Sequence, residues 1–179
     1  DAIEARNGEN KARVVAGYCW PWLSKKNPQA SDIVIGDYRR QWNLDKDGSL
    51  WIIAPESIEQ VGCIHTCQGL EVDYIGVIIG PAFIVRNGRI ITRAEERDRH
   101  DKSIRGYKTR LKTDPEQVRA EVDLIIKNTY RTLMTRGMKG CYVYCTDEET
   151  AEYFRTTIRS DPSVQASAFY RSEIHATGK

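Results

Sequence analysis

The segment Val61–Gly80, with the sequence VGCIHTCQGLEVDYIGVIIG, decides the fold. An apolar run leads into His65, a polar turn with Gln68 and Gly69 follows, and a second apolar run begins at Tyr74. Runs that are apolar on both faces are typical of strands buried in a parallel sheet. A turn that contains glycine exposes backbone amides, which can bind phosphate without a charged side chain. The segment therefore predicts two buried strands and, between them, a turn suited to an anionic ligand.

Comparable apolar runs and helical patterns recur on both sides of this segment. The runs predicted as strands are residues 12–16, 32–35, 50–54, 61–65, 74–79 and 141–145. A helix is predicted over residues 114–134, because Pro115 suits a first helical turn and apolar residues then repeat at helical spacing. A second helix should follow Thr146, which begins a capping-box pattern that ends at Glu149. Buried strands that alternate with helices predict an α/β fold with a largely parallel sheet.

A hairpin and a basic stretch follow the second apolar run. Asn87-Gly88, between two short apolar runs, is a strong signal for a hairpin turn. Residues 86–112 contain ten Lys and Arg against four Asp and Glu, a net charge of +6, whereas the whole chain carries +2. We expect an exposed basic insertion that attracts phosphates, with a solvated loop as the alternative. Its expected nucleic-acid contacts are Arg93, Arg97, Lys108 and Arg110.

The composition fits one globular domain. The chain has 179 residues, 27 Lys and Arg against 25 Asp and Glu, and 40% apolar residues. We expect the domain to span residues 1–160, followed by an irregular tail over residues 161–179. No apolar run approaches the roughly 20 residues that cross a bilayer, and the first residues do not resemble a signal peptide. Five cysteines, an odd number, argue against a secreted disulfide framework. We therefore expect a cytoplasmic piece of a longer chain, with no membrane partner.

Two groups of residues imitate metal sites. Cys63, His65 and Cys67 lack the Cys-x-x-Cys spacing of common zinc sites. The apolar run 141–145, followed by an Asp-Glu pair, imitates the magnesium-binding strand of P-loop enzymes. However, no phosphate loop of the pattern Gly-x-x-x-x-Gly-Lys-Ser/Thr precedes it. The sequence therefore predicts no metal site in this chain.

Three segments resemble a known family. They are residues 17–22 (GYCWPW), 65–71 (HTCQGLE) and 128–137 (NTYRTLMTRG). The second and third resemble motifs V and VI of superfamily 1 helicases, in the same order and at a similar separation. All three resemble a prokaryotic family of helicase-like, ATP-binding proteins of unknown function, which is itself similar to the helicase-like part of Schlafen proteins. The likeness covers residues 10–158, and we expect the two tryptophans of the first segment to pack at a strand end rather than to stack on bases.

The resemblance implies the second RecA-like domain of a nucleic-acid-dependent ATPase or helicase. ATP and Mg²⁺ would lie between this domain and an N-terminal RecA-like domain of the same chain. Arg136 would be the catalytic arginine finger, and we expect its side chain over the carboxyl edge of the sheet rather than in the core. The implied ATP contacts are Gln68, Gly69, Glu71 and Arg136, and the implied nucleic-acid contacts are His65 and Thr66. The alternative is a degenerate motor domain that acts as a non-catalytic nucleic-acid or protein binding module.

The missing phosphate loop yields a first testable prediction. The isolated chain should neither hydrolyse ATP nor bind it tightly, because phosphate-loop amides provide most of the affinity for a triphosphate. Isothermal titration calorimetry and a phosphate-release assay measure both properties. Micromolar affinity or measurable turnover would show that this chain builds a nucleotide site by itself.

Overall fold

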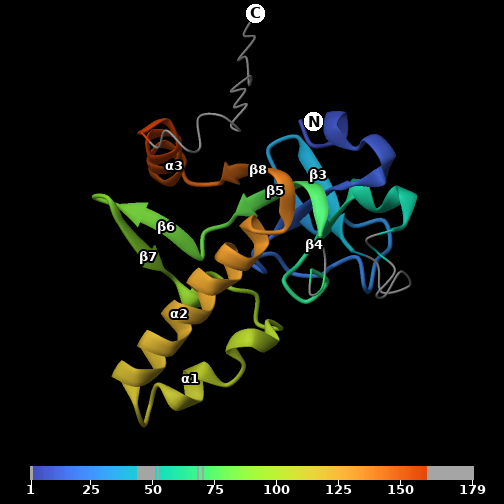
Figure 1. Ribbon diagram of the computed structural model, residues 1–179. Helices are drawn as coiled ribbons and strands as arrows, with labels where there is room; N and C mark the ends of the chain where they lie inside the picture. Colours follow the sequence, from blue (N-terminus) through green and yellow to red (C-terminus); the bar gives the residue numbers. More distant parts are fainter. Residues whose placement is uncertain (1, 44–50, 52, 68, 70, 161–179) are drawn as a thin grey trace, which may run out of the picture.

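A six-stranded sheet forms the centre of the molecule (Figure 1). The computed structural model describes residues 2–43, 51, 53–67, 69 and 71–160. The strand order is β2-β3-β4-β1-β5-β8, and every neighbouring pair is parallel except β2 and β3. The strands are β1 Ala12–Ala16, β2 Ile33–Ile35, β3 Tyr38–Trp42, β4 Gln60–Gly62, β5 Val72–Ile79 and β8 Gly137–Cys145. The predicted α/β fold with a largely parallel sheet is confirmed.

The long helix α2, Pro115–Met134, covers one face of the sheet. Asp114 caps it by accepting a hydrogen bond from the Gln117 amide at 3.2 Å, and proline occupies the first turn, as the sequence predicted. Ile126 and Tyr130 of α2 are fully buried against Val15 and Val77 of the central strands. In Figure 1 the end of α2 reaches the sheet beside β5, and its beginning lies beside the short helix α1, Tyr107–Arg110. Five 3₁₀ helices are also described: η1 Glu4–Arg6, η2 Gly8–Asn10, η4 Pro55–Glu59, η5 Ala94–Glu96 and η6 Lys102–Ile104.

Aromatic side chains fill part of the opposite face. Trp42 of β3 is fully buried, and the rings of Tyr18, Trp20 and Trp22 surround it with centroid separations of 5.3 to 6.5 Å. The Trp42 indole N–H donates to the Trp20 carbonyl oxygen at 3.2 Å. Trp20 and Trp22 therefore pack at the end of β1, as expected, and help to hold β3 in the sheet.

Two predicted strands differ from the observed ones. Residues 51 and 53 lie in turns, and positions 50 and 52 fall outside the described residues, so the strand predicted over residues 50–54 is wrong. The sheet instead contains β3, whose sequence YRRQW looks polar because only Trp42 is buried in this strand, which lies between the edge strand β2 and β4. Strand β4 ends early at Gly62, since the Thr66 hydroxyl accepts a hydrogen bond from the Cys63 amide at 2.8 Å and closes a turn.

The predicted hairpin is confirmed as strands β6, Phe83–Arg86, and β7, Arg89–Thr92. Asn87 and Gly88 have φ values of 51° and 71°, the left-handed conformation that a tight two-residue turn of this kind requires. The hairpin lies against the helix α3, Glu148–Ser160 (Figure 1). The Val85 amide donates to the Thr150 hydroxyl at 2.8 Å, so this helix supplies a partner for the hairpin backbone.

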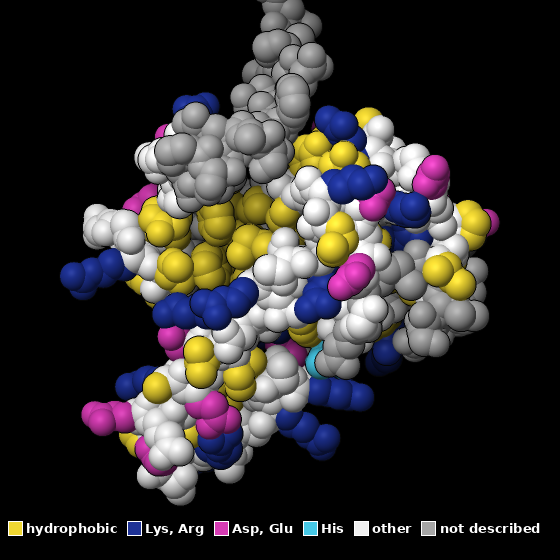
Figure 2. All heavy atoms as spheres, in the orientation of Figure 1, with side chains coloured by type: hydrophobic (Ala, Val, Ile, Leu, Met, Phe, Trp, Pro, Cys, Tyr) yellow, Lys and Arg dark blue, Asp and Glu magenta, His cyan; other side chains and the backbone are white. Residues whose placement is uncertain are grey.

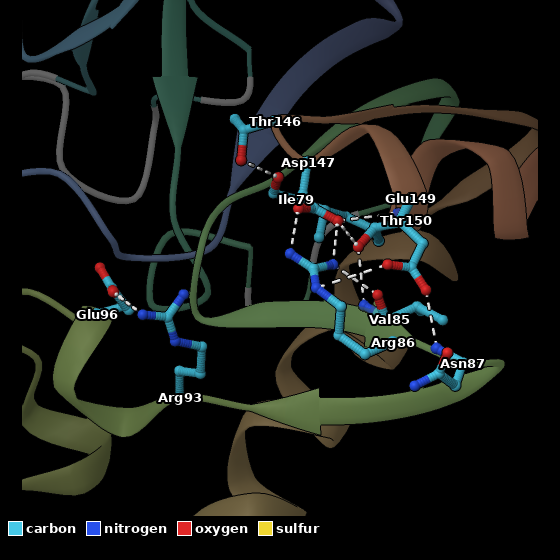
Figure 3. Close-up of polar contacts among 10 residues, drawn as sticks. All are labelled: Ile79, Val85, Arg86, Asn87, Arg93, Glu96, Thr146, Asp147, Glu149 and Thr150. Carbon is cyan, nitrogen blue, oxygen red and sulfur yellow. Dashed lines mark hydrogen bonds and ion pairs between the residues drawn. The ribbon is translucent and has the colours of Figure 1, made fainter.

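Asp147 joins the hairpin to the start of α3 (Figure 3). Its carboxylate accepts two hydrogen bonds from the Arg86 guanidinium, at 2.6 and 2.7 Å, and one from the Thr150 amide at 3.0 Å. The predicted capping box is therefore wrong in detail: Asp147 is the cap, while the Thr146 hydroxyl donates to the Ile79 carbonyl oxygen at 3.2 Å. The Arg86 hydrogen bonds, followed by those from Thr150, hold the Asp147 pKa well below its usual range.

This cap predicts a pH-dependent contribution to stability. Asp147→Ala should lower the free energy of unfolding by about 1 kcal/mol at pH 7, the usual cost of losing a helix cap. Because the folded-state pKa is depressed, the deficit should be fully present above about pH 4 and shrink as the pH falls below that value. Urea denaturation between pH 3 and pH 7 measures it. Glu148→Ala is the control, since that exposed carboxylate binds only Arg155 in the described part of the chain; equal deficits for both variants would contradict the assignment of Asp147 as the cap.

Candidate nucleotide and nucleic-acid site

The two helicase-like segments meet at one edge of the sheet. Strands β5 and β8 are parallel neighbours with Val72 opposite Gly137, and the Val72 amide donates to the Arg136 carbonyl oxygen at 3.1 Å. Glu71 and Arg136 therefore stand directly before the amino ends of adjacent strands. The pairing brings together residues that are far apart in the sequence.

Arg136 lies in the short turn between α2 and β8. Its amide donates to the Leu133 carbonyl oxygen at 3.3 Å, and its side-chain Nε donates to the Thr132 carbonyl oxygen at 3.2 Å. The residue is half-buried and is not part of the core. The expectation of a place at the carboxyl edge is wrong, because a helix that leads into a parallel strand ends at the amino end of that strand.

The turn that precedes β5 lies near Arg136. Gly69 and Glu71 are exposed, and Gly69 has a φ of 73°, a backbone conformation that residues other than glycine rarely adopt. Gln68, the remaining predicted ATP contact, falls outside the described residues. Burial raises the pKa of the neighbouring Cys67 thiol to about 12, and the charge of Arg136 opposes that shift, which indicates that the two residues are close. The structure thus groups Gly69, Glu71 and Arg136.

The other two motif residues lie at the opposite edge. His65 is exposed in the turn that follows the carboxyl end of β4, so it is accessible to a ligand. Thr66 is half-buried, and its hydroxyl both accepts from the Cys63 amide and donates to the Cys63 carbonyl oxygen. This hydroxyl holds the turn together. The predicted site is therefore divided between the two edges of the sheet, with the segment 63–71 running between them.

The predicted contacts of the basic stretch occupy different environments. Arg93 forms ion pairs with Glu96 at 2.5 Å and with Glu95 at 3.6 Å, as Figure 3 shows for Glu96. Arg110 is bound by Glu121 through two hydrogen bonds, one of them 2.9 Å long. Lys108 is exposed. Carboxylates of the basic stretch and of α2 thus neutralise two of the cations that the sequence suggested were available to nucleic acid.

Arg97 is buried, so the expectation that it is exposed is wrong. Its Nε donates to Asp101 Oδ2 at 2.6 Å, and neither side chain has any exposed surface. The Asp101 carboxylate also accepts from the Ser103 amide at 2.9 Å and from the Ser103 hydroxyl at 2.7 Å. Arg97 and Asp101 lie outside the helices, so the helical spacing rule does not apply and the sequence did not identify the pair.

Among the described residues, no group of three or more His, Cys, Asp or Glu side chains is placed to hold a metal ion. Cys63 and Cys67, part of the zinc-like pattern, are buried thiols. No helix in the described ranges is long and apolar enough to cross a membrane.

Comparison with known proteins shows the family to which the chain belongs. The family profile described as "Schlafen group 3, DNA/RNA helicase domain" matches residues 1–147, which include both helicase-like segments. This chain belongs to that Schlafen family. An uncharacterized protein of the yeast Saccharomyces cerevisiae is 28% identical over 160 residues, which cover 85% of this chain and 33% of the yeast protein. The chain thus spans about a third of the length of this curated relative. No solved structure matches the chain described here significantly.

Membership of the Schlafen helicase family confirms the helicase-like resemblance. It also agrees with nucleotide binding in general, and the mostly parallel α/β sheet is consistent with a RecA-like fold. The roles of individual residues remain predictions.

The buried Arg97–Asp101 pair yields a stability prediction. Asp101→Asn should lower the free energy of unfolding by about 3 to 5 kcal/mol, because it leaves a buried guanidinium without its counter-charge. The double variant Arg97→Met/Asp101→Asn should be less destabilised than the sum of its single variants. Arg93→Met is the control, since its partly exposed ion pairs are worth about 1 kcal/mol or less. Urea denaturation gives the values, and additive single-variant effects would contradict a coupled buried pair.

Proposed function

We propose that this chain is the second RecA-like domain of a nucleic-acid-dependent ATPase, and that Arg136 reaches the γ-phosphate of ATP held by a separate RecA-like domain. The observation that carries the proposal is the hydrogen bond from the Val72 amide to the Arg136 carbonyl oxygen. It joins the residue that directly follows the segment resembling motif V to Arg136 of the segment resembling motif VI. Residues that serve one nucleotide must lie at one edge of the domain, and this bond brings Glu71 and Arg136 to the same edge.

The local structure suits Arg136 for a role in phosphoryl transfer. Backbone hydrogen bonds hold the turn on both sides of it, and its Nε is anchored to the end of α2. A guanidinium held in this way stabilises the charge that develops on phosphate oxygens during hydrolysis, without the cost of ordering a loose side chain. Arginine fingers accelerate phosphoryl transfer by about 10³- to 10⁵-fold. In this proposal the phosphate loop and the Mg²⁺ ligands belong to the other domain.

Gly69 and Glu71 would contact the nucleotide beside Arg136. The left-handed conformation of Gly69 allows the backbone of the turn to approach a ligand closely. Glu71 is exposed directly before β5, where its carboxylate can accept hydrogen bonds from ribose hydroxyl groups. In the proposed arrangement, His65 at the carboxyl end of β4 faces the nucleic acid. The segment 63–71 then connects the nucleotide edge to the nucleic-acid edge.

Turnover of the protein that contains both motor domains tests the proposal. Arg136→Ala should lower kcat at least about 10³-fold while ATP affinity and melting temperature change little, because the finger acts mainly in the transition state. Arg136→Lys should not restore turnover, since lysine lacks the planar fork that spans two phosphate oxygens. Arg119→Ala is the matched control, because Arg119 is an exposed arginine near the beginning of the same helix.

Two results would contradict the proposal. Turnover of Arg136→Ala within a few-fold of the parent protein would exclude the finger role. Arg131, near the end of α2, or Lys139, which pairs with Asp73 at 2.8 Å near the same edge, would then be the next candidate. A parent protein that binds nucleic acid but shows no turnover would instead favour the non-catalytic binding module.

A further inference from the structure

Residues 97–105, here called the 97–105 loop, cross the carboxyl end of the central strand β1. The Asp98 amide donates to the Tyr18 carbonyl oxygen at 2.9 Å, and Tyr18 follows β1 by two residues. Burial raises the Tyr18 pKa, and the nearby charges of Asp98 and Cys63 raise it further. Both groups are therefore close to Tyr18. The loop thus lies beside the turn that presents His65.

The carboxylates of this loop bind within the loop. Asp101 is buried against Arg97 and also accepts hydrogen bonds from Ser103. Asp98 Oδ1 accepts from the His100 amide at 2.8 Å and lies 2.9 Å from His100 Nδ1. The Asp98 side chain is only 9% exposed. The negative charges of the loop are therefore mostly hidden from the surface.

The remaining cations of the loop are exposed at the surface. Arg99, Lys102 and Arg105 are exposed, and in the described part of the chain none of them forms an ion pair with a carboxylate. By contrast, Arg86, Arg93 and Arg110 are each bound by at least one carboxylate. Lys and Arg side chains project from this part of the surface beside a histidine (Figure 2). The loop therefore presents positive charge on a backbone that the buried pair holds in place.

We infer that the 97–105 loop binds the sugar-phosphate backbone of nucleic acid through Arg99, Lys102 and Arg105. The inference rests on the proposed function, which identifies the polyanion as nucleic acid. The contacts described above identify the loop as the place where it binds. Cations without carboxylate partners can neutralise phosphates directly, whereas Arg93 and Arg110 must first break existing ion pairs. The buried Arg97–Asp101 pair fixes the loop before the ligand arrives, which reduces the entropy lost on binding. We therefore expect the cations of this loop to contact nucleic acid in place of Arg93, Arg97 and Arg110.

Salt-dependent binding by this chain tests the inference. Fluorescence anisotropy would follow binding of a labelled 20-nucleotide single strand, as DNA and as RNA of the same sequence, between 50 and 200 mM salt. Three lost phosphate contacts should reduce the slope of log K against log salt by about 2, because each contact to a single strand contributes about 0.7. We therefore expect the triple variant Arg99→Ala/Lys102→Ala/Arg105→Ala to bind at least tenfold more weakly at 50 mM salt. Its melting temperature should match that of the parent chain.

A second triple variant separates location from net charge. Arg89→Ala/Lys112→Ala/Arg119→Ala removes the same charge from exposed positions outside the loop and should leave the slope nearly unchanged. Equal effects of the two triple variants would overturn the inference, as would a parent chain that binds neither strand at 50 mM salt. Because turnover is not measured in this assay, failure of the arginine-finger proposal and failure of this inference give different results.

Discussion

The pairing of β5 with β8 is the constraint on which the rest of the site depends. The two strands are neighbours over their full length, and the bond from the Val72 amide to the Arg136 carbonyl oxygen closes the pairing at its amino end. A parallel strand pair requires a crossover, and here α2 provides its final helix. The end of α2 must therefore deliver Arg136 beside the turn that contains Gly69 and Glu71. Geometry of this kind follows from the topology and does not depend on side-chain contacts.

Buried polar contacts determine which charges remain available at the surface. The stretch 86–112 is strongly basic in the sequence, but Asp147, Asp101 and Glu121 bind three of its arginines. These pairs attach the hairpin to α3, hold the 97–105 loop, and link the region of α1 to α2. Three cations of this stretch without a carboxylate partner in the described residues, Arg99, Lys102 and Arg105, lie together where the chain crosses the carboxyl end of β1. The domain thus separates the edge of the proposed nucleotide contacts from a positively charged edge, with the segment 63–71 between them.

The sequence predicted the features that depend on local patterns. Helix α2 and the hairpin at Asn87-Gly88 were predictable because their signals, a proline in the first turn and a two-residue turn with glycine, act within a few residues. Strand β3 was missed because Trp42 is its only buried residue and its other residues are polar, so it lacks the apolar run of a central strand. The burial of Arg97 was missed because overall charge does not reveal which cation meets a carboxylate inside the fold. Likewise, the motifs give candidate residues for the site, but the edge on which Arg136 lies follows from the strand order.

The most direct test of the central claim is a structure of the protein with both motor domains bound to ADP, Mg²⁺ and aluminium fluoride, a mimic of the transferring phosphoryl group. The account predicts that the amino ends of β5 and β8 face the nucleotide, with the Arg136 guanidinium in hydrogen-bond contact with the fluoride ligands. It would be contradicted by a structure in which the nucleotide is fully bound while this edge faces solvent or an arginine from another element makes that contact.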